Sequence, residues 1–206
     1  MTKHYDRAYF DRWYRDPCSC MWTRGAVARK ARMVLGIAEH LLERRVRSVL
    51  DIGCGEGSWR AALRGLRPGL RYAGVDSSPY VVERFGRRQN IVHGEVGRLE
   101  RTGIGGTFDL VVCCDVLHYV PTADVRRGLR FMAERTGGVA FLEAYAWDDE
   151  IEGDRARFQR RRAPVYRRLF REAGFAPVGL HCYVTKDRAA DLTRLELPPP
   201  ASARRA

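Results

Sequence analysis

The sequence predicts a doubly wound α/β fold, in which helices cover both faces of a mainly parallel sheet. Two observations carry this prediction. Strand-like and helix-like patterns alternate from about residue 46 onward, and the first buried strand ends directly in the glycine-rich run 53–57. Parallel strands need crossover connections, and such sheets bind ligands beyond the carboxyl ends of their strands. We therefore expect a ligand site beside this glycine run.

The bulk composition is typical of one globular domain. The chain has 206 residues, of which 45% are hydrophobic and 30% are charged, so it can bury a true core. No apolar run approaches the roughly 20 residues that cross a bilayer. The first ten residues mix charged and aromatic side chains and lack the apolar stretch of a secretory signal. These features predict a soluble, cytoplasmic protein without a membrane partner.

The chain begins with a predicted helical segment, residues 1–45. From Gly25 to Arg47 the apolar residues largely follow the three-and-four spacing of an amphipathic helix. The residues before this helix are unusually aromatic, with Tyr5, Tyr9, Phe10, Trp13, Tyr14 and Trp22. These aromatic side chains either pack as an ordinary helix does or cover a ligand site.

Residues 46–190 contain the strands and helices of the predicted sheet. The predicted strands are Val46–Ile52, Arg71–Val75, Asn90–His93, Phe108–Cys113, Gly138–Ala144 and Leu180–Thr185. A serine cap and Pro79 begin a helix that runs to about Phe85, Thr122–Arg135 forms another, and a third ends at Gly174. Residues 191–206, with three consecutive prolines, are predicted to be disordered.

Arginine dominates the charge of the chain. The formal net charge is +12, the pI is near 9.9, and arginine outnumbers lysine 34 to 3. Clustered cations favour a nucleic-acid partner, but these arginines are scattered along the whole chain. The densest group is Arg155, Arg157, Arg160, Arg161, Arg162, Arg167, Arg168 and Arg171. We favour a solvated helix face over a substrate-docking patch for this group.

The six cysteines indicate a reducing compartment. Cys54 lies in the glycine run, and Cys113 and Cys114 lie at the end of an apolar strand. These positions fit small, buried, reduced thiols. No pair has the C-x-x-C spacing of a structural zinc site, and no metal site is predicted. A thiol-based metal or arsenic site at Cys18 and Cys20 is the minor alternative.

The residues that carry chemistry begin with Asp51 and the glycine run. Glycines permit the tight turn and let a ligand approach the main chain. Asp76 ends the second strand 25 residues after Asp51, a spacing that fits an acid on ribose hydroxyls. The ligand therefore has a ribose, whereas Glu56 would repel the pyrophosphate of a nicotinamide cofactor. The structural alternatives are that Asp51 and Asp76 cap local turns, and Asp109 is expected to be a strand-opening residue.

Four segments, in order, resemble the motifs of class I S-adenosylmethionine-dependent methyltransferases over residues 46–145. Asp51–Gly57 resembles the glycine loop under the cofactor's methionine portion, and Asp76 resembles the acid that binds the ribose. Gly94–Val96 resembles the motif that meets the adenine amino group, with Glu95 where Asp is usual. Residues 108–119 resemble a strand whose end faces the transferring methyl group.

The resemblance implies a Rossmann-like sheet of seven strands over residues 46–190 and S-adenosylmethionine as the cofactor. It also implies an N-terminal helical lid over cofactor and acceptor, and acceptor contacts in the insertion that begins at Trp147. The cofactor-binding residues that it implies are Asp51, Gly53, Cys54, Gly55, Asp76, Ser77, Glu95, Val96 and Cys114.

Methyl transfer from a sulfonium is an in-line displacement, so alignment and the exclusion of water are its main demands. A hydroxyl or protonated amine acceptor also needs a base. His118 and Asp115 are the predicted catalytic residues, Glu143 and Tyr145 are a third candidate, and packing is the alternative role of His118. The predicted substrate-binding residues are Tyr9, Trp13, Tyr14, His118 and Tyr145.

Three functions remain at this point. The leading one is methyl transfer to an oxygen or nitrogen atom of a small-molecule acceptor. A nucleic-acid or protein methyltransferase would use the arginines, but the chain has no separate binding domain and no Asn-Pro-Pro-Tyr-type motif of base-amino methylation. A non-catalytic protein that binds the cofactor as a regulator is the third, and the sequence predicts no oligomeric state.

Overall fold

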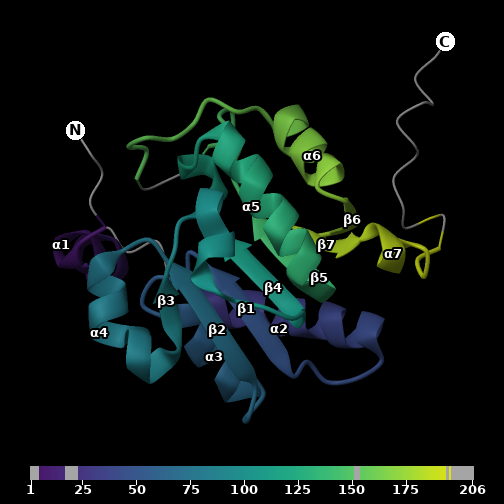
Figure 1. The fold of residues 1–206 in the computed structure, drawn as a ribbon, viewed down its shortest axis with the longest axis horizontal. Helices are drawn as coiled ribbons and strands as arrows, with labels where there is room; N and C mark the ends of the chain where they lie inside the picture. Colours follow the sequence, from purple (N-terminus) through teal and green to yellow (C-terminus); the bar gives the residue numbers. More distant parts are fainter. Residues whose placement is uncertain (1–4, 17–22, 151–153, 194, 196–206) are drawn as a thin grey trace.

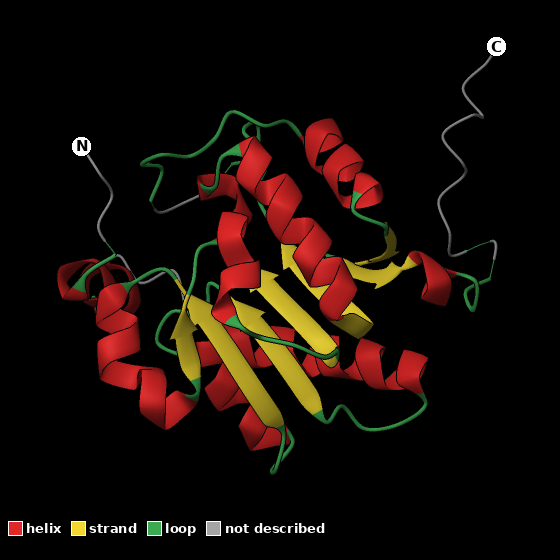
Figure 2. Ribbon diagram, in the orientation of Figure 1, coloured by secondary structure: helices red, strands yellow, loops and turns green. Residues whose placement is uncertain are grey.

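The computed structural model describes residues 5–16, 23–150, 154–193 and 195, which form a seven-stranded sheet with helices on both sides (Figures 1 and 2). The strands are β1 (Ser48–Ile52), β2 (Arg71–Asp76), β3 (Ile91–His93), β4 (Phe108–Cys114), β5 (Thr136–Glu143), β6 (Phe175–Gly179) and β7 (Cys182–Thr185). Their order in the sheet is β3-β2-β1-β4-β5-β7-β6. The pairs among β1 to β5 are parallel, whereas β7 is antiparallel to β5 and β6. The predicted doubly wound, mainly parallel sheet is confirmed.

Two hydrophobic cores hold the helices to the two faces of the sheet (Figure 2). The helical segments are α1 (Arg7–Phe10), the π-helical η1 (Asp11–Arg15), α2 (Arg24–Leu42), α3 (Ser58–Leu66), α4 (Pro79–Gln89), the 3₁₀ segments η2 (Val96–Thr102) and η3 (Leu117–Tyr119), α5 (Thr122–Arg135), α6 (Ala163–Glu172) and α7 (Lys186–Ala189). α2, α3 and α4 share one core with the sheet, and η2, α5 and α6 share the other. Val49 and Leu50, neighbours on β1, fall in different cores because successive strand residues face opposite sides.

The predicted signals at the ends of the helices are present in the structure. The Ser78 hydroxyl accepts a hydrogen bond from the Val81 amide (3.2 Å), and Pro79 occupies the first turn of α4. This helix runs one turn beyond the predicted end at Phe85, because Arg87 and Arg88 are good helix formers. It ends at Asn90, whose φ of +58° is left-handed.

The predicted last strand, Leu180–Thr185, is wrong in extent. The chain forms two antiparallel strands there, and β6 was not predicted. Leu180 and His181 have φ values of +50° and +62°, so they form a two-residue turn between Gly179 and Cys182. Two left-handed central residues match the twist of a hairpin. Neither residue is the Asn or Gly that normally signals such a turn.

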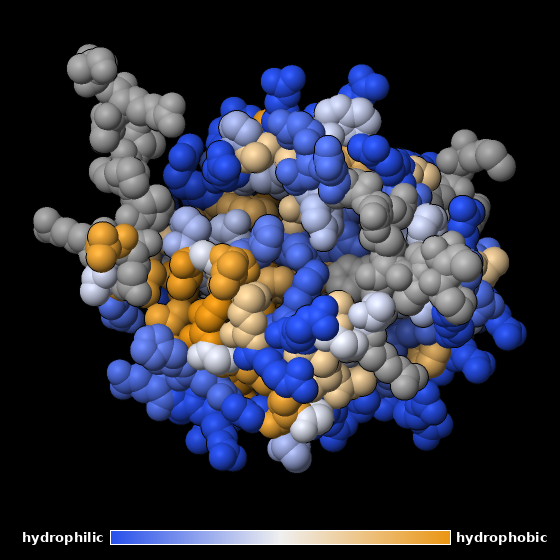
Figure 3. Space-filling model, turned by 180° about the vertical axis from the view of Figure 1, so that it is seen from behind, coloured by the Kyte–Doolittle hydropathy of each residue, from blue (hydrophilic) through white to orange (hydrophobic). Residues whose placement is uncertain are grey.

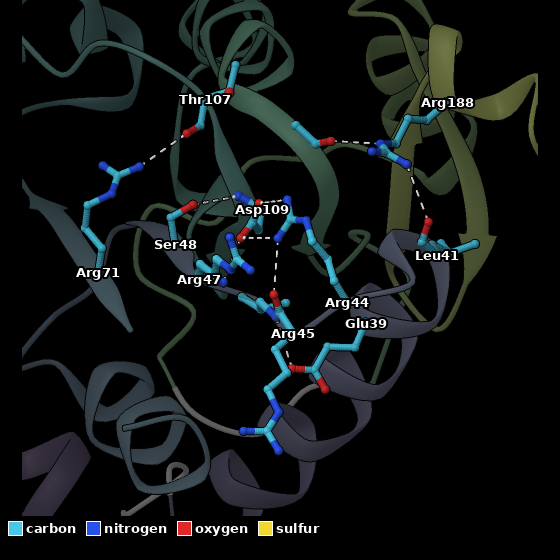
Figure 4. A network of polar contacts seen from close by, with 12 residues as sticks. Glu39, Leu41, Arg44, Arg45, Arg47, Ser48, Arg71, Thr107, Asp109 and Arg188 are labelled. Carbon is cyan, nitrogen blue, oxygen red and sulfur yellow. Dashed lines mark hydrogen bonds and ion pairs between the residues drawn. The ribbon is translucent and has the colours of Figure 1, made fainter. Parts of the chain in front are cut away.

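A network of hydrogen bonds joins the amino-terminal ends of β1 and β4 (Figure 4). The Asp109 carboxylate on β4 accepts a hydrogen bond from the Arg47 amide (2.6 Å) and two from the Arg44 guanidinium (2.7 and 3.0 Å). Its own amide donates to the Ser48 hydroxyl at 3.0 Å. Asp109 therefore fixes the start of β4 against β1, and the prediction of a strand-opening residue is confirmed.

The dense arginine group is divided, in contrast to the predicted solvated helix face. Its members on α6, Arg167, Arg168 and Arg171, are exposed. Arg161 is instead 4% exposed. Its guanidinium donates hydrogen bonds to the carbonyls of Leu117 and Val120 and to the Thr122 hydroxyl. These hydrogen bonds from the two Nη atoms offset the cost of burying the cation, whereas Nε has no partner among the described residues, and Arg161 thereby links two loops of the fold.

The surface of the described residues is mainly hydrophilic. Seen from behind, hydrophilic side chains surround most of the molecule, and an apolar area lies over the side that carries β6 and β7 (Figure 3).

No helix in the described part of the chain is both long and apolar enough to span a bilayer. No group of three or more His, Cys, Asp or Glu residues in it could hold a metal ion. Cys54, Cys113 and Cys114 are free, buried thiols as predicted, whereas Cys18 and Cys20 lie outside the described residues.

Candidate functional site

A cavity of about 600 Å³ lies at the carboxyl ends of the parallel strands. The arrowheads of these strands point toward the side of the molecule that carries α1 (Figure 1). The strand order reverses between β1 and β4, and open α/β sheets hold their ligands at such a switch point. The cavity volume falls in the range of roughly 300–1,000 Å³ that is typical of small-molecule sites.

The glycine run forms the floor of the cavity. Gly53, Gly55 and Gly57 have φ values of +72°, +51° and +83°, which glycine adopts at little cost. A Cβ atom on Gly53 would lie 2.3 Å from a methyl group of Val116, so no larger residue fits. Gly53 and Gly55 both line the cavity. A ligand can therefore approach the main chain itself at this loop.

Asp76, at the end of β2, holds its carboxylate at the cavity wall in a fixed orientation. One carboxylate oxygen accepts a hydrogen bond from the Gly55 amide (2.7 Å) and the other from the Ser78 amide (2.8 Å). Burial raises the pKa of Asp76, and these two amides oppose that rise. Because each oxygen keeps a lone pair, the carboxylate can still accept hydrogen bonds from two vicinal hydroxyls.

Seven of the nine predicted cofactor residues line the cavity: Gly53, Gly55, Asp76, Ser77, Glu95, Val96 and Cys114. Asp51 and Cys54 are not among the described residues that line it. Asp51 is 1% exposed and accepts a 2.7 Å hydrogen bond from the Tyr72 hydroxyl. Burial raises the pKa of this carboxyl group to about 7. Asp51 is therefore buried behind the cavity wall, and Cys54, within the glycine loop, is 5% exposed.

The cavity wall fits the S-adenosylmethionine that the sequence resemblance implies. The open main chain at Gly53 and Gly55 admits a ligand backbone, Asp76 suits a ribose, and Glu95 follows β3, where an adenine amino group is expected. Glu56, on which the sequence argument against a pyrophosphate rested, does not line the cavity, and its carboxylate is paired with Arg15.

The predicted catalytic pair, Asp115 and His118, is brought together by the structure, but only Asp115 lines the cavity. His118 Nε2 lies 3.2 Å from Asp115 Oδ1, although the two groups are not aligned for a hydrogen bond. His118 is 0% exposed and stacks on Phe158 at a ring distance of 4.8 Å. The imidazole is thus not placed to touch an acceptor, so the structure favours the packing role for it.

Residues 5–16, here called the lid segment, lie against the glycine loop. Arg15 Nη2 lies 2.6 Å from both carboxylate oxygens of Glu56, and the Tyr80 hydroxyl donates to the same carboxylate at 3.1 Å. The Ser78 hydroxyl donates to the Tyr5 carbonyl. Within the predicted segment of residues 1–45, α2 packs mainly in the helical layer of the sheet, and residues 1–4 and 17–22 lie outside the described residues.

Three of the predicted substrate residues, Tyr9, Trp13 and Tyr14, line the cavity from the lid segment, and Tyr145 lines it from beyond β5. The sequence did not single out Lys30, Tyr119 or Asp154, which also line it. Lys30 Nζ lies 2.5 Å from Glu143 Oε2, and the Cys114 thiol lies 2.8 Å from the same oxygen. The sequence feature that could have drawn attention to Lys30 is that lysine is rare in this chain. No local pattern indicates Asp154 as a site residue.

Comparisons with known proteins agree with this geometry. Residues 26–187 match the family described as a methyltransferase domain. No curated protein matches the chain significantly.

Solved structures with the same fold include DesVI of Streptomyces venezuelae, with a TM-score of 0.61 and 15% identity over 77% of this chain and 92% of DesVI. The magnesium protoporphyrin IX methyltransferase ChlM from Synechocystis PCC 6803, with S-adenosylhomocysteine bound, gives 0.56 and 20% over 84% and 87%. The sugar N-methyltransferase KedS8 from Streptoalloteichus sp ATCC 53650 gives 0.55 and 25% over 75% and 59%.

The family match spans the glycine loop, the acid that ends β2 and the whole sheet. The cavity that these elements form has the groups that a sulfonium nucleoside requires. This chain therefore belongs to the class I methyltransferases, which use S-adenosylmethionine.

Proposed function

We propose that this protein transfers the methyl group of S-adenosylmethionine to an oxygen or nitrogen atom of a small-molecule acceptor. The observation that carries the proposal is a cavity of about 600 Å³ with the lid segment docked at its glycine floor. A site of this size, covered on one side, suits the cofactor together with a small acceptor. The solved structures of ChlM and KedS8 are similar in fold and are named for small-molecule acceptors, which supports the same class.

The residues of this chain would bind, orient and shield the reactants. S-adenosylmethionine supplies an electrophilic methyl group when it is bound. Asp76 holds the ribose, and the glycine loop lets the ligand lie against the main chain. The lid-segment aromatics Tyr9 and Trp13 exclude water, which an in-line displacement requires. Asp115, on the cavity wall after β4, is placed to accept a proton from the acceptor.

The lining does not support a nucleic-acid acceptor. Carboxylates line the cavity on both the β2–β3 side and the β4–β5 side, with Asp76 and Asp115 as examples. These groups repel the phosphates that the surface arginines would attract.

Calorimetry with S-adenosylhomocysteine tests the proposal. We expect binding by the native chain, no binding of a nicotinamide dinucleotide, and at least a 30-fold loss of affinity in Asp76→Ala. Two ribose hydroxyls would lose a charged acceptor, at about 2 kcal/mol or more together. The matched control Glu83→Gln removes an exposed carboxylate on α4 and should bind normally.

Transfer itself is then followed by mass spectrometry, as the gain of one methyl group on candidate acceptors. Unchanged affinity in Asp76→Ala contradicts the ribose assignment. A native chain that binds no S-adenosylhomocysteine contradicts the proposed function.

A further inference from the structure

The cavity carries negative charge in a chain whose net charge is +12. Among the described residues, six carboxylates line it: Asp76, Glu95, Asp115, Asp124, Glu150 and Asp154. Lys30 and Arg157 are the cationic side chains in the same lining. Lys30 is already paired with Glu143, 2.5 Å away. The cavity therefore has the opposite sign to the molecule as a whole.

Five of the six carboxylates are divided between two halves of the cavity, and the sixth, Asp124 on α5, is paired with Arg127. Asp76 follows β2 and Glu95 follows β3, on the side where the nucleoside is expected. Asp115 follows β4, and Glu150 and Asp154 follow β5, beyond the switch point of the sheet. The second group lies on the acceptor side, where the ribose and adenine do not account for it.

Tyrosines accompany the acceptor-side carboxylates. Tyr5, Tyr9, Tyr119 and Tyr145 all line the cavity. Burial, together with Asp154 and Asp76, raises the pKa of Tyr5 to about 12, so this side chain stays a neutral phenol. Burial and Asp115 also raise the pKa of Tyr119. Neutral aromatic rings beside carboxylates attract cations through both the ring faces and the charges.

Local contacts hold the carboxylate of Asp154 and the backbone of Asp115 on the acceptor side. Asp115 has a left-handed φ of +62°, and its amide donates to the Glu143 carbonyl at 3.1 Å. One Asp154 carboxylate oxygen accepts a hydrogen bond from the Ala156 amide (2.8 Å), and the Asp154 carbonyl accepts one from the Tyr119 hydroxyl (2.7 Å). Both groups are thus positioned before any ligand binds.

From this arrangement we infer that the acceptor is an amine that enters the cavity as an ammonium ion, and that its nitrogen receives the methyl group. The inference rests on the proposed function and specifies its substrate class. An acceptor with a carboxylate or phosphate beside the reacting atom is disfavoured by the same charges.

The proton balance of this reaction gives Asp115 a second task. An ammonium nitrogen has no lone pair, so one proton first passes to the Asp115 carboxylate. The freed lone pair of the nitrogen forms the N–C bond while the S–C bond breaks. The electron pair of the S–C bond stays on sulfur, which becomes a neutral thioether. Asp115 then releases its proton to water, and the product is the methylated ammonium ion.

Binding of matched ligands to the protein saturated with S-adenosylhomocysteine tests the inference. One set shares a phenol ring: tyramine, tyrosol and 4-hydroxyphenylacetate. The other shares a hexose: glucosamine, glucose and glucuronate. Within at least one set we expect the amine to bind at least tenfold more tightly than the alcohol, with no detectable binding of the carboxylate.

The double variant Asp115→Asn/Asp154→Asn should reduce this amine preference to less than threefold. Asparagine tolerates the left-handed backbone at residue 115 and can accept the amide hydrogen bond at residue 154, so the fold is retained. Unchanged affinity for S-adenosylhomocysteine verifies this. Glu83→Gln, which removes one exposed carboxylate that is not part of the lining, should keep the full preference.

Each result decides a different question. A native protein that does not bind S-adenosylhomocysteine contradicts the proposed function and this inference with it. Normal binding of S-adenosylhomocysteine combined with no amine binding, or with equal binding of amine and alcohol, overturns this inference alone. A preference that survives in the double variant overturns it as well, because the carboxylates would then not be its source.

Discussion

At the scale of single residues, the end of β4 shows what a buried environment does to a side chain that looks catalytic in the sequence. His118 follows an apolar strand at the edge of the sheet where chemistry is expected. Its surroundings come from Phe158 and from Tyr145, whose amide donates to Nδ1 at 3.5 Å. A local sequence pattern does not show such distant neighbours, and it therefore could not predict that Asp115 lines the cavity whereas His118 does not.

Replacing His118 with alanine should chiefly destabilise the protein. The substitution leaves a hole beside Phe158 in a fully buried place, at a cost of about 3 kcal/mol in the free energy of unfolding. Chemical denaturation measures this cost. Affinity for S-adenosylhomocysteine should stay within about threefold under conditions where the variant remains folded. A loss of stability below about 1 kcal/mol would argue against the packing role.

Asp51 should make the stability of the ligand-free protein depend on pH. Burial raises its folded-state pKa to about 7, above the unfolded value near 3.9. The folded state therefore holds this proton more tightly, and its contribution to stability is lost as the pH rises through 7. Between pH 5 and pH 8 the native chain should lose about 3 kcal/mol relative to Asp51→Asn. Urea denaturation of both proteins at the two pH values measures this difference, and parallel pH profiles would contradict it.

At the scale of elements, the ion pair between Arg15 and Glu56 connects the lid segment to the glycine loop. The pair is partly exposed, with side-chain exposures of 44% and 18%, so its contribution is modest in spite of its geometry. Glu56 lies beside the glycines, but its carboxylate is directed toward the lid segment, where the Arg15 guanidinium neutralises its charge.

Arg15→Ala should loosen the lid segment without unfolding the domain. We expect affinity for S-adenosylhomocysteine to fall by at most about fivefold, and amide exchange to increase in residues 5–16. The matched control is Arg7→Ala, because Arg7 pairs only with Asp11 among the described residues, within its own segment. Equal exchange rates in the two variants would show that the pair does not anchor the lid segment.

Local patterns in the sequence predict the parallel half of the fold and its ligand loop. Short apolar runs identify the strands β1 and β4. The glycines that follow β1 predict the turn, because Gly53 and Gly55 have positive φ angles that glycine adopts at little cost. The hairpin of β6 and β7 escaped prediction because its turn uses Leu180 and His181 in place of Asn or Gly. The pair of Lys30 and Glu143 joins residues 113 positions apart, and no local pattern encodes such a contact.

At the scale of the whole molecule, surface and cavity have opposite electrostatic characters. Exposed arginines dominate the outside, whereas carboxylates dominate the lining of the site. Surface charges are screened over roughly 8 Å in physiological salt, so the arginines do not cancel the field inside the cavity. The bulk charge of the chain is therefore a poor guide to its acceptor, and the lining is the better one.

Arg161 has a consequence for how this site can diversify. Its guanidinium fastens the stretch after β4, at Leu117, Val120 and Thr122, to the stretch before α6. Both stretches border the acceptor half of the site, and two of the three acceptors are main-chain carbonyls, which every residue type supplies. This buried cation therefore fixes the path of the main chain on both sides of the site, while the side chains at Leu117 and Val120 can vary without loss of these two hydrogen bonds.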